Sequence, residues 1–174
     1  ARLTELSMED PLTGLANRRR AEQAFAEHYS MPATAGQAGP ALFMLDLDHF
    51  KAFNDRWGHQ AGDACLRAVA EVLRHAASRH GGLAARFGGE EFIFLLRADD
   101  AGRAQAIAEE LRVAIERIEI EDHGATSTAT CTSSIGIALH QGPEAPNLAR
   151  MLSAADAALY RAKADGRNRT MVET

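Results

Sequence analysis

The pattern of apolar and polar positions predicts helices and strands in mixed order along this chain. A continuous apolar run over 41–45 is typical of a strand buried on both faces. The stretches 83–87 and 91–96, joined through two glycines, predict a β-hairpin. The stretches 118–120 and 126–139 alternate and are rich in β-branched residues, so they predict a second hairpin.

Apolar residues recur at helical spacing elsewhere. Helices are expected over 17–29, within 49–57, over 104–115 and over 148–162, where Gly166 would end the last one. A further amphipathic helix carries Leu66, Val69, Ala70, Leu73 and Ala77 and is expected to begin near Gly62-Asp63. Because helices and hairpins are intermixed, the predicted fold class is α/β: a single-domain sandwich with a mixed, largely antiparallel central sheet flanked by helices.

The length and composition fit one folded domain. The chain has 174 residues, of which 46% are hydrophobic and 25% charged, enough for one sizeable core. Residues 1–9 are expected to be the end of an upstream signalling helix or linker, and residues 10–174 the domain itself. No apolar run approaches the roughly 20 residues of a membrane span, and no secretory signal is visible. These features favour a cytoplasmic location, or the cytoplasmic part of a larger, membrane-anchored protein, without direct membrane insertion.

Charge and cysteine content narrow the choice of partners. The formal net charge is −5, so the surface as a whole does not attract nucleic acid. A polyanionic ligand would therefore need local cations or metal ions. Cys65 and Cys131 show no zinc or disulfide spacing and lie in apolar patterns. They are expected to be buried free thiols, as in a reducing compartment.

Two acidic motifs follow predicted strands. Asp46-Leu47-Asp48 stands where the apolar run ends, and buried carboxylates are costly unless cations or donors meet them. In Gly88-Gly89-Glu90-Glu91 the glycines allow a tight bend and close approach of a ligand. Taken alone, each motif also fits solvated acids at an exposed strand end. Taken together, they offer the hard oxygen donors that Mg²⁺ prefers, and such ions would activate a hydroxyl and stabilise a leaving pyrophosphate.

Four motifs, in order, resemble the GGDEF family of diguanylate cyclases in its GGEEF form. They begin at Asp10 (DPLTGLANRR), Asp46 (DLDHFKAFND, then GHQAGD), Gly88 (GGEEF) and Asp156 (DAALYRAK, then GRNR). The resemblance implies a nucleotide cyclase/polymerase-palm fold and the condensation of two GTP into cyclic di-GMP with release of two pyrophosphates. The alternatives are a degenerate module that binds GTP or cyclic di-GMP, a mixed adenine–guanine cyclase, which Asp63 disfavours, and a mononucleotide cyclase.

The resemblance also assigns the metal and base residues. Asp46, the carbonyl of Leu47, Glu90 and Glu91 would hold Mg²⁺, or Mn²⁺ in its place, with two ions per active half-site. Glu90 is also implied as general base for the ribose 3′-hydroxyl. The division of base and ligand roles between Glu90 and Glu91 stays open, because a metal-bound hydroxyl need not have a separate base.

Further residues are implied to bind the nucleotide. Asn54 and Asp63 would read guanine, His59 would lie beside the nucleotide, and Lys51 would stabilise charge on the phosphates. Lys163 and Arg167 are four apart near a predicted helix end, so they would project to one side and grip the β- and γ-phosphates. The alternative for this pair is that it only complements the helix dipole.

Regulation and assembly are implied as well. Each domain would hold one GTP, so catalysis would require a homodimer, and an upstream sensory domain would control it. Many family members carry an inhibitory product site, RxxD, and Arg79 to Gly82 stand at its position with Gly82 in place of the Asp. We therefore expect weak product inhibition through Arg79, and stronger inhibition in Gly82→Asp.

Overall fold

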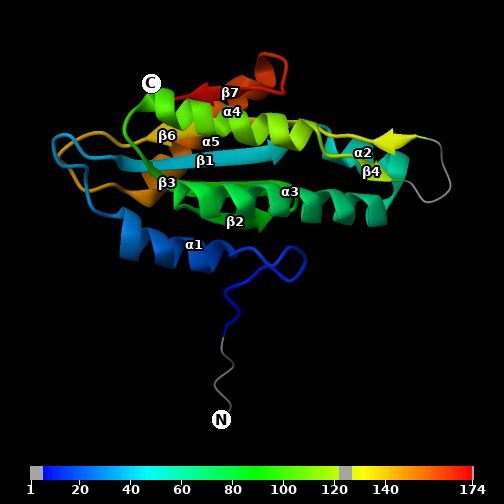
Figure 1. Cartoon of the computed structure of the whole chain (residues 1–174), viewed down its shortest axis with the longest axis horizontal. Coiled ribbons are helices and arrows are strands. Elements are labelled where there is room, and N and C mark those ends of the chain that lie inside the picture. The colour runs from blue at the N-terminus through cyan, green and yellow to red at the C-terminus, as the bar shows by residue number, and fades with distance from the viewer. Residues whose placement is uncertain (1–5, 122–126, 174) are drawn as a thin grey trace, which may run out of the picture.

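The structure is a computed structural model that describes residues 6–121 and 127–173. Its centre is a five-stranded sheet of order β2-β3-β1-β6-β7, with β1 in the middle (Figure 1). The β6–β7 pair is parallel and the other pairs are antiparallel. The predicted mixed, largely antiparallel sheet is thus confirmed. The strands are β1 (Gly39–Leu47), β2 (Leu83–Gly88), β3 (Glu91–Ala98), β6 (Ser133–Leu139) and β7 (Thr170–Val172).

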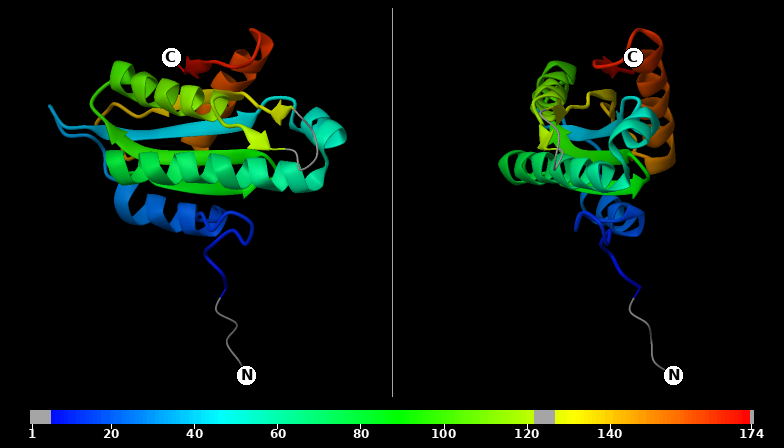
Figure 2. Two further views of the ribbon diagram at one scale, coloured as in Figure 1. Left: turned by 45° about the vertical axis from the view of Figure 1, so that its right-hand side comes forward. Right: turned by 90° about the vertical axis from the view of Figure 1, so that its right-hand side faces the viewer.

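Helices cover both faces of this sheet, as the end-on view in Figure 2 shows. Alternate residues of β1 point to opposite sides, so Phe43 and Leu45 join one core cluster while Leu42 and Met44 join the other. The face of Phe43 and Leu45 carries α2 (Phe50–Trp57), α3 (His59–His80) and α4 (Ala101–Glu116); the other face carries α1 (Arg18–Ala24), the π-helical turn η1 (Phe25–Tyr29) and α5 (Leu148–Ala164).

Among residues 6–121 and 127–173, no helix combines the length and the apolar content that a membrane span requires.

Most predicted elements are confirmed, and their caps explain where they begin. The helix expected over 17–29 is α1 continued by η1, and the Asn17 side chain accepts a hydrogen bond from the amide of Arg20 at 3.0 Å. The helix expected from 148 is α5, which Asn147 caps in the same way. Both cysteines are buried free thiols, as expected.

The predicted start of α3 is wrong. The helix begins at His59 rather than near Gly62, and Gly62 lies inside it. The first turn escaped the apolar pattern because His59 and Gln60 are exposed. A Cβ at position 62 would overlap the side-chain oxygen of Asn54, so any larger residue there would displace the Asn54 side chain.

The second predicted hairpin is confirmed only in part: residues 120–121 and 128–129 pair antiparallel, but the second stretch does not continue as one strand. The stretch expected to form one strand breaks into β5 (Thr128–Ala129), which pairs with β4 (Ile120–Glu121), and β6, which pairs with β1. The reason is burial: six of the seven residues of β6 are buried, which requires a place inside the main sheet. Thr126, the expected start, lies outside the described residues.

The N-terminal expectation is tested only in part. Residues 6–9 are not helical, and Glu9 instead forms an isolated bridge with Ala16. Residues 1–5 lie outside the described residues, so the assignment of 1–9 to an upstream linker stays a prediction.

Candidate active site

Three carboxylates from two motifs meet at one end of the sheet. Asp46 of β1 pairs in register with Glu91, the first residue of β3. Glu90 stands in the preceding turn, and its carbonyl accepts a hydrogen bond from the amide of Leu47 at 3.4 Å. Asp46 is only 6% exposed, whereas Glu91 is exposed. The antiparallel register therefore joins the two acidic motifs at one end of the sheet, where β1 ends and β3 begins.

The crowding of these acids changes their protonation. Burial raises the pKa of Asp46, and the nearby charges of Glu90 and Asp48 add to the shift. A hydrogen bond from Lys163 Nζ to Asp46 Oδ2, at 2.5 Å, opposes it. Burial also raises the pKa of Glu91, and the charge of Asp46 contributes. A cation placed between these groups would relieve their repulsion.

The oxygen donors at this end of the sheet fit a hard divalent cation. Among residues 6–121 and 127–173, no three Asp, Glu, His or Cys side chains are arranged to hold a metal by themselves. Mg²⁺ uses only one or two protein carboxylates and completes its shell with water and phosphate oxygens. Asp46, the carbonyl of Leu47 and the two glutamates supply oxygen donors of this kind. The buried Asp46 already holds one cation, the Lys163 ammonium group.

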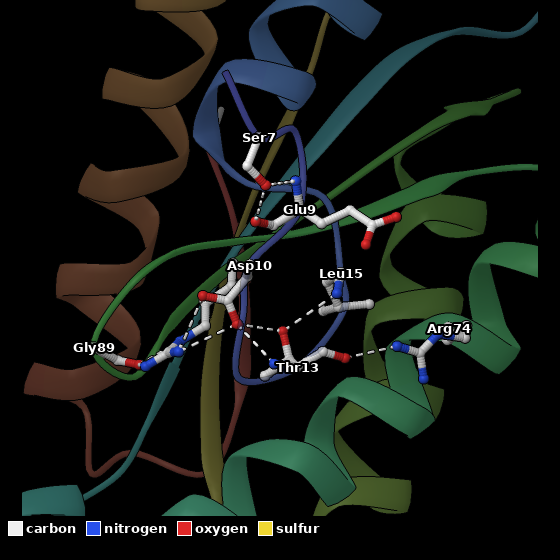
Figure 3. A network of polar contacts seen from close by, with 8 residues as sticks. Ser7, Glu9, Asp10, Thr13, Leu15, Arg74 and Gly89 are labelled. Carbon is white, nitrogen blue, oxygen red and sulfur yellow. Dashed lines mark hydrogen bonds and ion pairs between the residues drawn. The ribbon is translucent and has the colours of Figure 1, made fainter. Parts of the chain in front are cut away.

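The signature turn, Gly88-Gly89, is held in place by residues that lie outside the acid cluster of Asp46, Glu90 and Glu91 (Figure 3). Gly88 and Gly89 have positive φ angles, +153° and +49°, which glycine adopts most readily. Arg86 donates to the carbonyl of Gly89 from Nε at 3.0 Å and from Nη2 at 2.8 Å. Its Nη1 reaches Asp10 at 3.2 Å. Arg86 thereby clamps the backbone next to Glu90.

The opening motif supports this clamp. Asp10 accepts hydrogen bonds from the amide and hydroxyl of Thr13, at 2.8 and 2.7 Å. Although burial opposes it, these bonds and the charge of Arg86 lower the pKa of Asp10. The carbonyl of Thr13 accepts from Arg74 of α3 at 2.8 Å. The pairing of Asp10 with Arg86 was missed from the sequence, since nothing local links residues so far apart.

Asp48 has a structural position separate from the acid cluster. It is 6% exposed and accepts three hydrogen bonds: from Thr132 Oγ1 at 2.7 Å, from Ser134 Oγ at 2.6 Å and from the amide of Asn168 at 2.9 Å. Asn168 in turn accepts from Arg112 of α4 at 2.7 Å. Asp48 therefore fastens the turn after α5 to the end of β1, a function that sequence reasoning missed.

The two predicted phosphate residues are placed differently from expectation. Lys163 lies in α5, but Arg167 lies beyond the end of this helix, with φ +64°. Helical spacing therefore does not bring the two side chains to one side, and their phosphate-binding function stays a prediction. Arg167 is held near the end of β1 because the backbone amide of the next residue, Asn168, donates a hydrogen bond to Asp48.

The predicted guanine residues lie on α2 and α3. The side-chain oxygen of Asn54 is buried and has no hydrogen-bond partner within the described residues. An unpaired buried polar atom is costly, which suits a site that a ligand completes. His59 and Asp63 are exposed on the first turns of α3, and Lys51 is exposed on α2. In the described part of the chain, these last three side chains form no hydrogen bond or ion pair with protein.

Arg79 is engaged by the protein itself. It forms an ion pair with Glu110 of α4, and His80 contacts the same carboxylate at 3.1 Å. A Cβ at Gly82 would lie 2.6 Å from the carbonyl oxygen of Leu95. An acid does not fit at position 82 without movement of the backbone, so this contact disfavours Gly82→Asp as a way to restore a product site, and the strength of product inhibition stays a prediction.

Residues 7–169 match the family model described as "Diguanylate cyclase, GGDEF domain". The diguanylate cyclases DgcM of Escherichia coli (strain K12) and VdcA of Vibrio cholerae are each 38% identical, over 97% and 98% of this chain. The chain spans only 39% and 48% of their lengths.

Solved structures give the same match. The GGDEF domain of DgcB from Caulobacter crescentus, in complex with c-di-GMP, is 35% identical with a TM-score of 0.82, covering 97% of this chain and 96% of that one. The diguanylate cyclase SiaD of Pseudomonas aeruginosa, in complex with its activator SiaC, is 34% identical with a TM-score of 0.84, covering 98% of this chain and 63% of that one. The predicted palm-like cyclase fold is confirmed.

Proposed function

The chain belongs to the GGDEF-domain family of diguanylate cyclases, and we propose that it condenses two GTP into cyclic di-GMP and releases two pyrophosphates. The observation that carries this proposal is the register pairing of Asp46 with Glu91 beside the signature turn. The similarity to curated diguanylate cyclases over nearly the whole chain supports it.

Asp46, the carbonyl of Leu47, Glu90 and Glu91 are proposed to hold the metal. Their fit rests on the oxygen donors and on the raised pKa values of Asp46 and Glu91. Two Mg²⁺ per half-site, or Mn²⁺ in their place, would supply Lewis-acid activation of the 3′-hydroxyl and neutralise the leaving pyrophosphate. Lys163 would then leave Asp46 and turn to the phosphates.

The protein's own groups orient the reaction. The 3′-hydroxyl oxygen of one GTP attacks the α-phosphorus of the other, the bond to pyrophosphate breaks, and Glu90 takes the hydroxyl proton. Lys51 stabilises negative charge that develops on the phosphates, while Lys163 and Arg167 hold the β- and γ-phosphates. The symmetric second attack closes the ring and releases the second pyrophosphate.

Guanine recognition is proposed for α2 and α3. The side-chain amide of Asn54 can flip, which exchanges its oxygen and its nitrogen, and the nitrogen can then donate a hydrogen bond to guanine O6. The Asp63 carboxylate would accept from N1–H and N2–H, and His59 would lie beside the nucleotide. Gly62 leaves the room that Asn54 needs for this contact.

The assembly is proposed to be a homodimer in the cytoplasm. A single set of site residues binds one GTP, so two domains must face each other for two attacks to occur. Residues 1–9 would link residues 10–174, the catalytic domain, to an upstream sensory domain that brings the pair together.

Product chromatography tests the activity directly. The protein is incubated with GTP and Mg²⁺, and cyclic di-GMP and pyrophosphate are separated and quantified. Glu91→Gln should reduce turnover by at least about a hundredfold while the fold survives, because an exposed isosteric change rarely unfolds a domain. Glu144→Gln, exposed and outside the site, is the matched control. Full activity of a folded Glu91→Gln protein would disprove the metal assignment.

The same experiment separates the alternative, a regulatory module that binds GTP or cyclic di-GMP without turnover. Such a module would retain nucleotide in equilibrium binding yet form no product at any protein concentration.

A further inference from the structure

Two cysteines that are 66 residues apart in sequence meet in the core. Cys65 belongs to α3 and Cys131 to the connection between β5 and β6. Their sulfur atoms are 3.1 Å apart, and the side chains are 0% and 7% exposed. A disulfide bond is about 2.05 Å long, so an approach of about 1 Å would join them. Nothing in the proposed cyclase chemistry uses this pair.

We propose that Cys65 and Cys131 form a modification site, a dithiol that a peroxide oxidises to an intramolecular disulfide. This inference does not depend on the proposed cyclase activity. It rests on the direct sulfur–sulfur contact and on the different surroundings of the two thiols.

Cys131 is the sulfur that reacts first. It is the more exposed of the two, and the hydrogen bond that the two sulfurs share lowers the pKa of Cys131. The same hydrogen bond, together with burial, raises the pKa of Cys65, so this thiol keeps its proton. A thiolate is the attacking form of cysteine, and the neighbouring thiol is placed to resolve the product.

The reaction balances with the peroxide as the only oxidant. The Cys131 sulfur attacks one peroxide oxygen, the O–O bond breaks, and a sulfenic acid and one water form. The Cys65 sulfur then attacks the sulfenic sulfur, the S–O bond breaks, the S–S bond forms and a second water leaves. Two thiol hydrogens and two electrons pass to the peroxide, which is reduced to two waters.

The bond would connect two parts of the proposed site. Cys65 follows Asp63 by two residues on α3, and Cys131 precedes Thr132, which donates to Asp48. A crosslink across 66 residues restricts the unfolded chain. The melting temperature should therefore rise by about 5–15 °C on oxidation.

The test uses the reduced protein and hydrogen peroxide. The intact mass, the thiol content in denaturant and the melting temperature are measured before and after treatment. We expect loss of two hydrogen masses, disappearance of both thiols and a higher melting temperature, all reversed by dithiothreitol. Cys65→Ser should instead gain oxygen on Cys131 without a rise in melting temperature.

Three results would overturn the proposal, all of them measured on the unmutated chain. Both thiols could remain free after prolonged treatment, oxygen could be added without loss of hydrogen, or a disulfide-linked dimer could form on a non-reducing gel. None of these readouts involves GTP turnover, so failure here is distinct from failure of the cyclase assignment.

Discussion

Replacing Asp48 with alanine would remove the acceptor of three hydrogen bonds at the end of β1. Two donors are hydroxyl groups of Thr132 and Ser134, which can rotate toward other acceptors. The third is the backbone amide of Asn168, which cannot rotate. The turn that carries Arg167 would lose its attachment to the sheet.

The magnitude follows from these partners. A hydrogen bond to a charged group contributes about 1.5–3 kcal/mol, which sets an upper bound of about 9 kcal/mol for three. Because the two hydroxyls can find other partners, we expect Asp48→Ala to lower the free energy of unfolding by about 3–5 kcal/mol. Asp48→Asn keeps one oxygen acceptor, and Ser134 can turn to accept from the new amide group. Its expected cost is about 1–2 kcal/mol.

Urea denaturation followed by circular dichroism measures this loss, with Asp99→Ala, an exposed acid, as the control. Michaelis constants measured in parallel should rise several-fold for GTP in Asp48→Ala and little in Asp48→Asn. The reasoning is refuted if Asp48→Ala is as stable as the unmutated protein, or if Asp48→Asn is as damaging as Asp48→Ala.

Three further outcomes are expected. Arg86→Lys cannot keep both the bidentate contact with the signature turn and the ion pair with Asp10. It should therefore lower the free energy of unfolding, measured by urea denaturation, by about 1–3 kcal/mol and lower kcat more than it raises KM. An unchanged kcat would contradict the proposed contact of Arg86 with the turn. The pKa of Asp46 is higher in the folded protein than its ordinary value of about 3.9. Protonated Asp46 therefore stabilises the fold at pH values below about 3.9, and this stabilisation is lost as the pH rises through the raised pKa. Mg²⁺ competes with that proton, so the rise in melting temperature on adding Mg²⁺ should be larger at about pH 7.5 than at about pH 5 and disappear in Asp46→Asn, and equal rises would count against the site. Gly82→Asp should destabilise the protein by about 1–3 kcal/mol without tightening cyclic di-GMP binding in calorimetry, because its Cβ would meet the carbonyl of Leu95; an unchanged melting temperature would show that the backbone yields freely.

The sequence alone predicted those strands, turns and acidic motifs that depend on contiguous residues. The unbroken apolar run before Asp46 predicted a central strand, because burial on both faces leaves no polar alternation. The two glycines before Glu90 predicted the first hairpin, because a tight reversal favours positive φ. The acids at both strand ends, and their resemblance to a known family, followed from short motifs alone. These features depend on residues close in sequence, and the sequence displays them directly.

Only the tertiary structure decided which residues and strands that are distant in sequence contact one another. The end of β1 gives the clearest case, because Asp46 and Asp48 look equivalent in sequence. Asp46 pairs in register with Glu91 and accepts a hydrogen bond from Lys163, whereas Asp48 accepts hydrogen bonds from other parts of the chain. The break between β5 and β6 has the same origin, because β6 could satisfy its apolar residues only beside β1. The contact of Cys65 with Cys131 spans 66 residues. Periodicity reports which side of an element is buried; which distant element covers it depends on how the whole chain closes around its core.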